Sequence, residues 1–156
     1  MQKVSTFLWF EHGVEEAAEL YTSLLPDSRI LHVQQFGEGM PDGLVVVRFT
    51  LGGVEYQAMN GGPNEGFTEA VSLSVVCDDQ AEVDRLWDAL TADGGRESMC
   101  GWLTDRWGVS WQIVPNRLLE LQADPDPERS RRANQAMLTM RKLDIAALEA
   151  AADGRS

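Results

Sequence analysis

The sequence predicts an α+β fold built from two tandem copies of one supersecondary unit, and two matched features indicate the duplication. Residues 53–57 read Gly-Val-Glu-Tyr-Gln, and residues 108–112 read Gly-Val-Ser-Trp-Gln. Each of these segments closes a stretch that opens with an apolar, β-rich strand followed by a helical pattern. A strand, a helix and further strands that recur along one chain indicate two repeats that share a core. A pocket commonly forms where two such copies meet, so equivalent inward-facing positions are the first places to look for a site.

The first copy, residues 3–60, is predicted to be a β-α-β-β-β module. Its helix carries apolar residues at intervals of three and four, and Pro26 ends that helix. Gly52-Gly53 is a pair that favours a tight hairpin turn. The expected elements are a strand at 4–10, a helix from Val14 to Leu25, and strands at 29–36, 45–51 and 54–60.

The second copy, residues 69–115, follows a glycine-rich linker at 61–68 and repeats the same order. Thr6 matches Ser72 near the start of the copies, and Gln57 matches Gln112 near their ends. The second copy is therefore the shorter one, chiefly in its middle hairpin. The expected elements are a strand at 70–77, a helix at 79–92, and short strands near 97–104 and 109–114.

The chain beyond the repeat is expected to be helical. We assign residues 1–124 to a single domain and residues 125–156 to a helical C-terminal extension. Pro125 and Pro127 start a helix, and Asp144 is placed to cap a last helix at 145–151. An apolar stripe in the extension is expected to pack against the body of the protein or a partner subunit: Ala133, Ala136, Met137 and Met140.

Composition limits the classes of partner. The 156 residues carry a net charge of −12 and a pI near 4.4, which argues against nucleic-acid binding because phosphate recognition needs clustered Lys and Arg. No cleavable signal pattern opens the chain, and no apolar run approaches the ~18 residues of a membrane helix. Two unpaired cysteines, Cys77 and Cys100, fit a reducing compartment. A cytoplasmic protein with no membrane partner is expected.

Several motifs together resemble one family. They are Asn60-Gly61-Gly62-Pro63, Cys77-Asp78-Asp79-Gln80, Cys100-Gly101-Trp102-Leu103-Thr104-Asp105, Trp111-Gln112-Ile113-Val114-Pro115 and the tail segment 142–148. This combination resembles the PhnB-like (demethylubiquinone methyltransferase-like) group of the vicinal oxygen chelate, or glyoxalase–bleomycin resistance, superfamily, over nearly the whole chain. The resemblance implies two modules that form a curved, barrel-like sheet around a cavity, a homodimer and a bacterial source.

The resemblance does not fix an activity, because one fold hosts many chemistries. Methyltransferase activity is not expected. A site for S-adenosylmethionine usually needs a glycine-rich turn between a strand and a helix, whereas the glycine clusters here precede strands or lie in hairpins. Those clusters are at 37–43, 52–53, 61–62 and 94–95.

A metal site is not expected either. The resemblance implies that metal-using relatives hold their ligands on the first and last strands of each module, positions that carry Thr6, Gln57, Ser72 and Gln112 here. Neutral amides and hydroxyls alone hold Zn²⁺, Ni²⁺ or Fe²⁺ poorly, since these metals favour imidazole, thiolate or charged oxygen donors. A replacement centre would have to use His12 or His32 with a carboxylate such as Glu55.

The remaining residues suggest a pocket lined by amides, hydroxyls and aromatic rings. If Gln57 and Gln112 face inward, strand alternation turns Tyr56 and Trp111 outward, under the helices. The candidate pocket residues are Thr6, Gln57, Asn60, Ser72, Cys100, Trp102 and Gln112.

The predicted function is binding of an unidentified small molecule in the cavity between the modules, with no metal and no cofactor. One alternative is a glyoxalase-like lyase, isomerase or dioxygenase-type enzyme with a non-standard metal or a site based on Cys100. Neighbouring residues supply neither a cation nor a base for that thiol, so it is a weak catalytic candidate. A further alternative is a drug-sequestering resistance protein whose acidic surface attracts a cationic drug.

Overall fold

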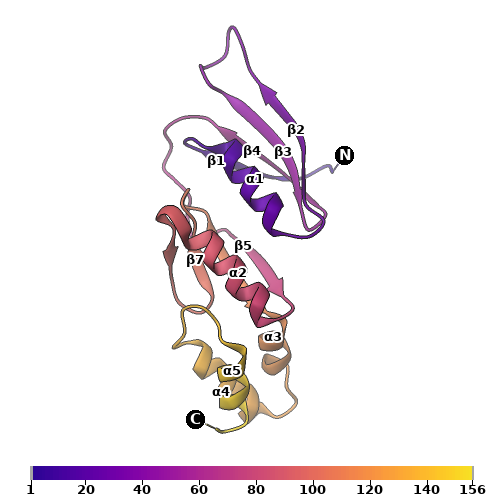
Figure 1. The fold of residues 1–156 in the computed structure, drawn as a ribbon, viewed down its shortest axis with the longest axis vertical. Helices are drawn as coiled ribbons and strands as arrows, with labels where there is room; N and C mark the ends of the chain where they lie inside the picture. The colour runs from indigo at the N-terminus through magenta and orange to yellow at the C-terminus, as the bar shows by residue number, and fades with distance from the viewer. Residues whose placement is uncertain (1, 156) are drawn as a thin grey trace. The chain divides into compact units, whose positions relative to one another are not determined.

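The computed structural model describes residues 2–155, and the chain divides into two compact units, Met1–Gly66 and Phe67–Ser156. Each unit contains one β-α-β-β-β module, and the second also contains the C-terminal helices (Figure 1). The two modules and the helical tail that the sequence predicts are therefore confirmed. The strands form two separate four-stranded sheets, which are not closed into a barrel.

The first unit has the strand order β1-β4-β3-β2. β1 is parallel to β4, and the other neighbours are antiparallel. A parallel pair needs a crossover connection, which α1 begins. The elements are β1 (Thr6–Phe10), α1 (Val14–Leu24), β2 (Arg29–Gln35), β3 (Val45–Leu51) and β4 (Val54–Asn60).

One face of this sheet packs under α1, and the other face is open. The alternation of β3 shows the division, because every second residue from Val45 to Leu51 is buried. The buried side chains of α1 lie at the three-and-four spacing that the sequence predicts: Val14, Ala17, Ala18 and Tyr21. On the opposite face of β1, Phe7 and Trp9 are 47% and 45% exposed.

The second unit repeats the topology in the order β5-β8-β7-β6, again with its first and last strands parallel. Asp79 caps α2 by accepting a hydrogen bond from the backbone N–H of Glu82. The helix buries Trp87, and the sheet buries Trp111 on its helix-covered face. The elements are β5 (Ser72–Cys77), α2 (Gln80–Thr91), a 3-10 turn (Ala92–Gly94), β6 (Arg96–Glu97), β7 (Trp102–Thr104) and β8 (Ser110–Pro115).

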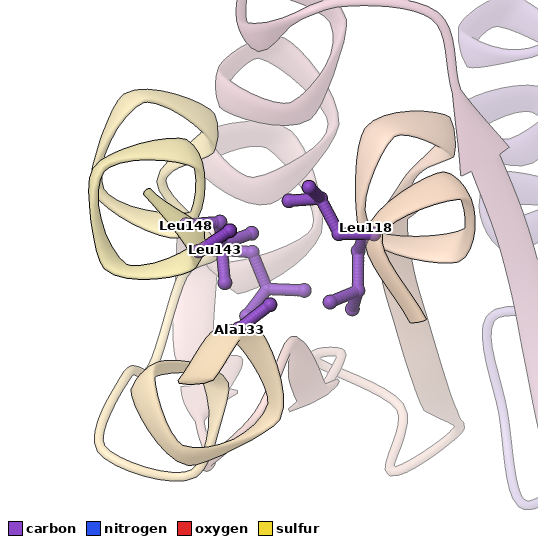
Figure 2. Close-up of a cluster of buried hydrophobic side chains, with 6 residues drawn as sticks. Leu118, Ala133, Leu143 and Leu148 are labelled. Atoms are coloured by element: carbon purple, nitrogen blue, oxygen red, sulfur yellow. The ribbon is translucent and has the colours of Figure 1, made fainter. Parts of the chain in front are cut away.

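Three helices follow β8: α3 (Asn116–Gln122), α4 (Pro127–Met137) and α5 (Ile145–Ala152). They share an apolar cluster in which the labelled side chains of Figure 2 point toward one another. Its buried members are Leu118, Leu121, Ala133, Leu143, Leu148 and Ala152. Asp144 caps α5, as predicted, by accepting a hydrogen bond from the N–H of Ala147. None of the described helices is long and apolar enough to cross a membrane.

The tail differs from the sequence prediction in two respects. α3 was not predicted, and α4 ends at Met137, so Met140 lies beyond the helix. The predicted apolar stripe still packs against the protein's own body, because Ala133 belongs to the cluster and Met140 contacts its edge.

Candidate functional site

The two repeated glutamines make the same contact in both modules. Nε2 of Gln57 donates to Oγ of Ser5 at 2.9 Å, and Nε2 of Gln112 donates to Oγ of Ser72 at 2.9 Å. Each bond joins the last strand of a module to the start of its first strand. Both glutamines lie on the open face of their sheet, since Ala58 and Ile113, their neighbours along the strands, are buried.

Thr6, the fourth of the predicted strand positions, does not face Gln57. Thr6 is in register with Tyr56 and lies on the same side of β1 as the buried Leu8, which is the side that α1 covers. Ser5 instead occupies the position equivalent to Ser72. The structure therefore brings Ser5, rather than Thr6, to Gln57.

The aromatic residues beside the glutamines lie on the helix-covered faces, as strand alternation predicts. Trp111 is 1% exposed. Tyr56 stacks on the buried Phe49, with ring centroids 5.8 Å apart, and burial raises the pKa of its hydroxyl. These rings belong to the cores of the modules.

A cleft of about 320 Å³ opens on the uncovered face of the second sheet, and we refer to it as the module-two cleft. Strand residues form its floor, among them Val76, Trp102, Gln112 and Val114. Trp102 and Gln112 are directly opposite each other in the β7–β8 pair. Three predicted site residues therefore line one cleft: Cys100, Trp102 and Gln112.

The helices after β8 supply the rest of the lining. From here on, the term C-terminal extension covers residues 116–155 and includes α3, which lies before the predicted boundary at residue 125. Leu118, Leu119 and Gln122 come from α3, and Met137 comes from the end of α4. No residue that lines the cleft carries a charge. Among the described residues, none donates a hydrogen bond to Oε1 of Gln112, so this amide oxygen is available to accept one from a ligand.

A second cleft of about 340 Å³ adjoins the first, because Cys100 and Trp102 line both. Its other walls include the hydroxyl-bearing Thr104 and Ser110 and one charged residue, Glu69. The open face of the second module thus offers an apolar region next to a more polar one.

The backbone of Cys100 takes part in docking the tail. Its φ of +60° places it in the left-handed region, and its N–H donates to the carbonyl of Met140 at 2.7 Å. The next residue, Gly101, donates to Arg141 at 2.8 Å. Cys77, in contrast, is fully buried, and burial together with the Glu82 charge raises the pKa of its thiol to about 12. Both thiols are free.

Asn60 closes the end of the first module's hairpin. Its Oδ1 accepts a hydrogen bond from the N–H of Val45 at 2.8 Å, across the β3–β4 pair. This contact satisfies a backbone donor at the end of the sheet. The structure thus gives Asn60 a local structural contact within the first unit.

The donor set does not fit a transition metal. The repeated glutamines bond to serine hydroxyls, and within residues 2–155 no three His, Cys, Asp or Glu side chains are grouped closely enough to hold an ion. His12 and His32 are both exposed. Neutral oxygen donors alone bind Zn²⁺, Ni²⁺ or Fe²⁺ weakly.

One buried carboxylate was missed by the sequence analysis. Asp105 is 3% exposed and accepts hydrogen bonds from the N–H groups of Trp107 and Val109 and from Nε1 of Trp111. It fixes the turn between β7 and β8. The Asp-x-x-Gly spacing to Gly108 is a turn signature that could have revealed it.

The doubled module, with one helix over one face of each sheet, is the architecture of the vicinal oxygen chelate superfamily. A family model described as 3-demethylubiquinone-9 3-methyltransferase matches residues 2–114. A solved structure described as a putative 3-demethylubiquinone-9 3-methyltransferase, PhnB protein, from Bacillus cereus is 36% identical, with a TM-score of 0.66. That match covers 73% of this chain and 99% of the other chain. The chain belongs to this PhnB-like family of the superfamily.

More distant structures share the fold alone. A fosfomycin resistance protein, FosX, from Mesorhizobium loti is 16% identical, with a TM-score of 0.55, and the match covers 80% of this chain and 100% of the other. A Leishmania major glyoxalase I is 13% identical, with a TM-score of 0.52, over 81% of this chain and 94% of the other. A comparison with curated proteins finds no match. The family model ends at residue 114, so the tail resemblance expected from the sequence lies outside it.

Proposed function

We propose that the protein binds a small, uncharged molecule in the module-two cleft and does so without a metal ion. The observation that carries this proposal is the Gln112 amide in a cleft whose lining is otherwise mostly apolar and wholly uncharged. Ligand sites typically combine apolar walls with a few oriented polar groups. Ser72 holds the amide nitrogen of Gln112, so the amide oxygen is oriented before a ligand arrives.

The lack of charged residues in the lining selects against ionic ligands in this cleft. A charged group that enters would lose its hydration and find no counter-ion among the lining residues. Desolvation of an unpaired charge costs more than that of a neutral hydrogen-bonding group. A neutral ligand with a hydrogen-bond donor fits the lining best.

Binding, rather than methyl transfer, is the function that the residues support. Gly52-Gly53 lies in the β3–β4 turn, and Gly94-Gly95 ends the 3-10 turn and leads directly into β6. Among the described residues, the strand-to-helix connections 11–13 and 78–79 contain no glycine pair, and β8 leads into α3 with no residue between them. We also propose that the protein is a cytoplasmic homodimer. Size measurement in solution would test the dimeric state.

The Gln112→Leu variant tests the proposal. In a fragment screen followed by NMR, uncharged fragments should shift the methyl signals of Val76, Val114 and Leu118 in the wild-type protein. Loss of the amide acceptor should weaken that binding about tenfold, the worth of about one hydrogen bond at a desolvated site. The matched control is Gln34→Leu, which removes an exposed amide from β2 and should leave affinity unchanged.

Two results would contradict the proposal. The module-two cleft would not be the binding site if the fragments shifted signals away from it. The same conclusion would follow if fragments bound Gln112→Leu as tightly as they bind the wild-type protein. Elemental analysis of protein purified without chelators provides the separate test of metal content, and stoichiometric Ni, Zn or Fe would overturn the metal-free assignment.

A further inference from the structure

The C-terminal extension is part of the module-two cleft and not a separate appendage. It contributes three apolar side chains to the lining: Leu118, Leu119 and Met137. They lie beside Val76 and Val114 of the sheet. Leu119 is 42% exposed, so it contacts the cleft without filling the apolar cluster beneath it.

The extension is held to the module by directional contacts. The amide of Gln80 donates to the carbonyl of Leu143 at 3.0 Å and accepts from the N–H of Ile145 at 2.8 Å. Lys142 pairs with Asp84 at 2.9 Å. These bonds join the tail to α2.

A close approach at Gly101 adds to this attachment. A Cβ at Gly101 would lie 2.9 Å from both the carbonyl oxygen of Ile113 and Cδ1 of Leu143, so only glycine lets the tail approach so closely. The N–H of Gly101 also bonds to the carbonyl of Arg141. The wall of the cleft is therefore fixed in place relative to its floor.

The wall lies outside the part of the chain that defines the family. The family model ends at residue 114, just before α3 begins at Asn116. The Bacillus cereus protein is matched over 99% of its length by only 73% of this chain. The family model therefore includes the strand residues that form the floor of the cleft and stops before the α3 and α4 residues that form its wall.

Resting on the proposed function, we infer that the C-terminal extension determines the ligand specificity of the module-two cleft. It selects a neutral, amphipathic molecule whose apolar chain lies against Leu119 and Met137 and whose polar end reaches Gln112. The lining gives the chemical reason, since apolar contact grows with chain length and a charged head has no partner there.

A homologous series of ligands tests the inference. Primary n-alkyl carboxamides from butanamide to decanamide would be titrated by calorimetry into wild-type protein, Leu119→Ala and Leu138→Ala. Wild-type affinity should rise with the length of the alkyl chain. Leu119→Ala should lower the affinity for the longest amide that binds by about tenfold, which is the loss expected when this apolar contact is removed. Leu138 is the matched control, because it is 61% exposed on the same extension and does not line the cleft.

The outcomes separate this inference from the proposed function. Equal affinities of wild type and Leu119→Ala, with Gln112→Leu still impaired, would overturn the role of the extension and leave the cleft intact. Binding of the matching n-alkyl carboxylates as tightly as the carboxamides, or no binding of any carboxamide by wild type, would overturn the ligand class. Thermal unfolding of both leucine variants verifies that neither loses its fold.

Discussion

The two cysteines test whether the site is a binding cleft or a thiol active site. Cys77 is buried with a pKa raised to about 12, so its reactive thiolate is scarce at neutral pH. Cys100 lines the cleft and is only half-buried. We expect a thiol reagent at pH 8 to modify one thiol per native chain, at Cys100, and to reach Cys77 only after unfolding.

The rate at which Cys100 reacts with the thiol reagent distinguishes a thiol that only lines the cleft from a catalytic one. A cleft-wall thiol should react at or below the rate of glutathione under the same conditions, and Cys100→Ser should abolish the native-state labelling. A rate about a hundredfold above that of glutathione would identify an activated nucleophile and would favour the enzyme alternative.

For single residues, the candidate site shows which positions could be predicted from the sequence and which could not. The repeat predicted Gln57 and Gln112, and both lie on open sheet faces with serine partners. Thr6 and Ser72 were matched because each lies 15 residues before an aromatic residue of the following helix, Tyr21 or Trp87. However, three residues connect β1 to α1 and only two connect β5 to α2. A shift of one residue turns a strand position to the opposite face, so this count selected Thr6 where the strand register gives Ser5.

Among the elements, the helical tail shows that segments far apart in sequence meet in the structure. Three residues meet where the extension docks: Gln80 from the segment 77–80, Gly101 from the segment 100–105 and Leu143 from the segment 142–148. Their spacing in sequence gave no sign of this contact. Their roles are visible only in three dimensions.

The docking contact predicts the effect of Gln80→Glu. A carboxylate keeps the acceptor for Ile145 but cannot donate to Leu143, and it adds a charge beside Asp84. We expect a loss of about 1–3 kcal/mol in the free energy of unfolding, which exceeds the ~0.3–1 kcal/mol that a negative charge gains at a helix N-terminus. Urea unfolding measures the loss, and faster hydrogen exchange at the Ile145 amide locates it.

The exposed Gln34 supplies the control, since Gln34→Glu should change stability by less than about 0.5 kcal/mol. Unchanged exchange at Ile145 in Gln80→Glu would mean that the Gln80 hydrogen bonds do not hold the tail in place.

α3 is the element that sequence reasoning did not find. It spans seven residues, fewer than an isolated helix needs to be stable in water. Its stability comes from Leu118 and Leu121, which pack into the cluster formed with α4 and α5 (Figure 2). Those partners lie later in the chain, so no local pattern marks the helix clearly. The longer strands and the two module helices, in contrast, carry their own periodicity and were predicted. The stretch predicted as strand near 97–104 is instead divided into β6 and β7 by a turn at 98–101.

In the whole molecule, the carboxylates with lowered pKa values are distributed unequally between the two units. The chain has a net charge of −12 at pH 7, so mild acid first relieves self-repulsion. The carboxylates whose pKa values are lowered belong to the second unit, and most are in its tail. Hydrogen bonds from Gln80 and Lys142 lower the pKa of Asp84, and those from Arg129 and Arg155 lower that of Asp153 to about 2.

This distribution predicts that acid loosens the tail before the first unit. A carboxylate with a lowered pKa stabilises the fold above its unfolded value of about 3.9, and that stability is lost as pH falls through its folded value. Stability should therefore hold or rise slightly from pH 7 to about 5, then fall between about pH 4 and pH 2. Because the pairs are exposed, added salt should shrink their contribution.

Hydrogen exchange with mass analysis of fragments, at low and high salt, would follow the acid transition. Residues 116–155 should lose protection at a higher pH than residues 2–66, and the difference should narrow in salt. Earlier loss in the first unit, or a decline already between pH 7 and 5, would contradict the prediction. Because the tail also forms the cleft wall, ligand affinity should decrease over the same acid range in which the tail loses protection.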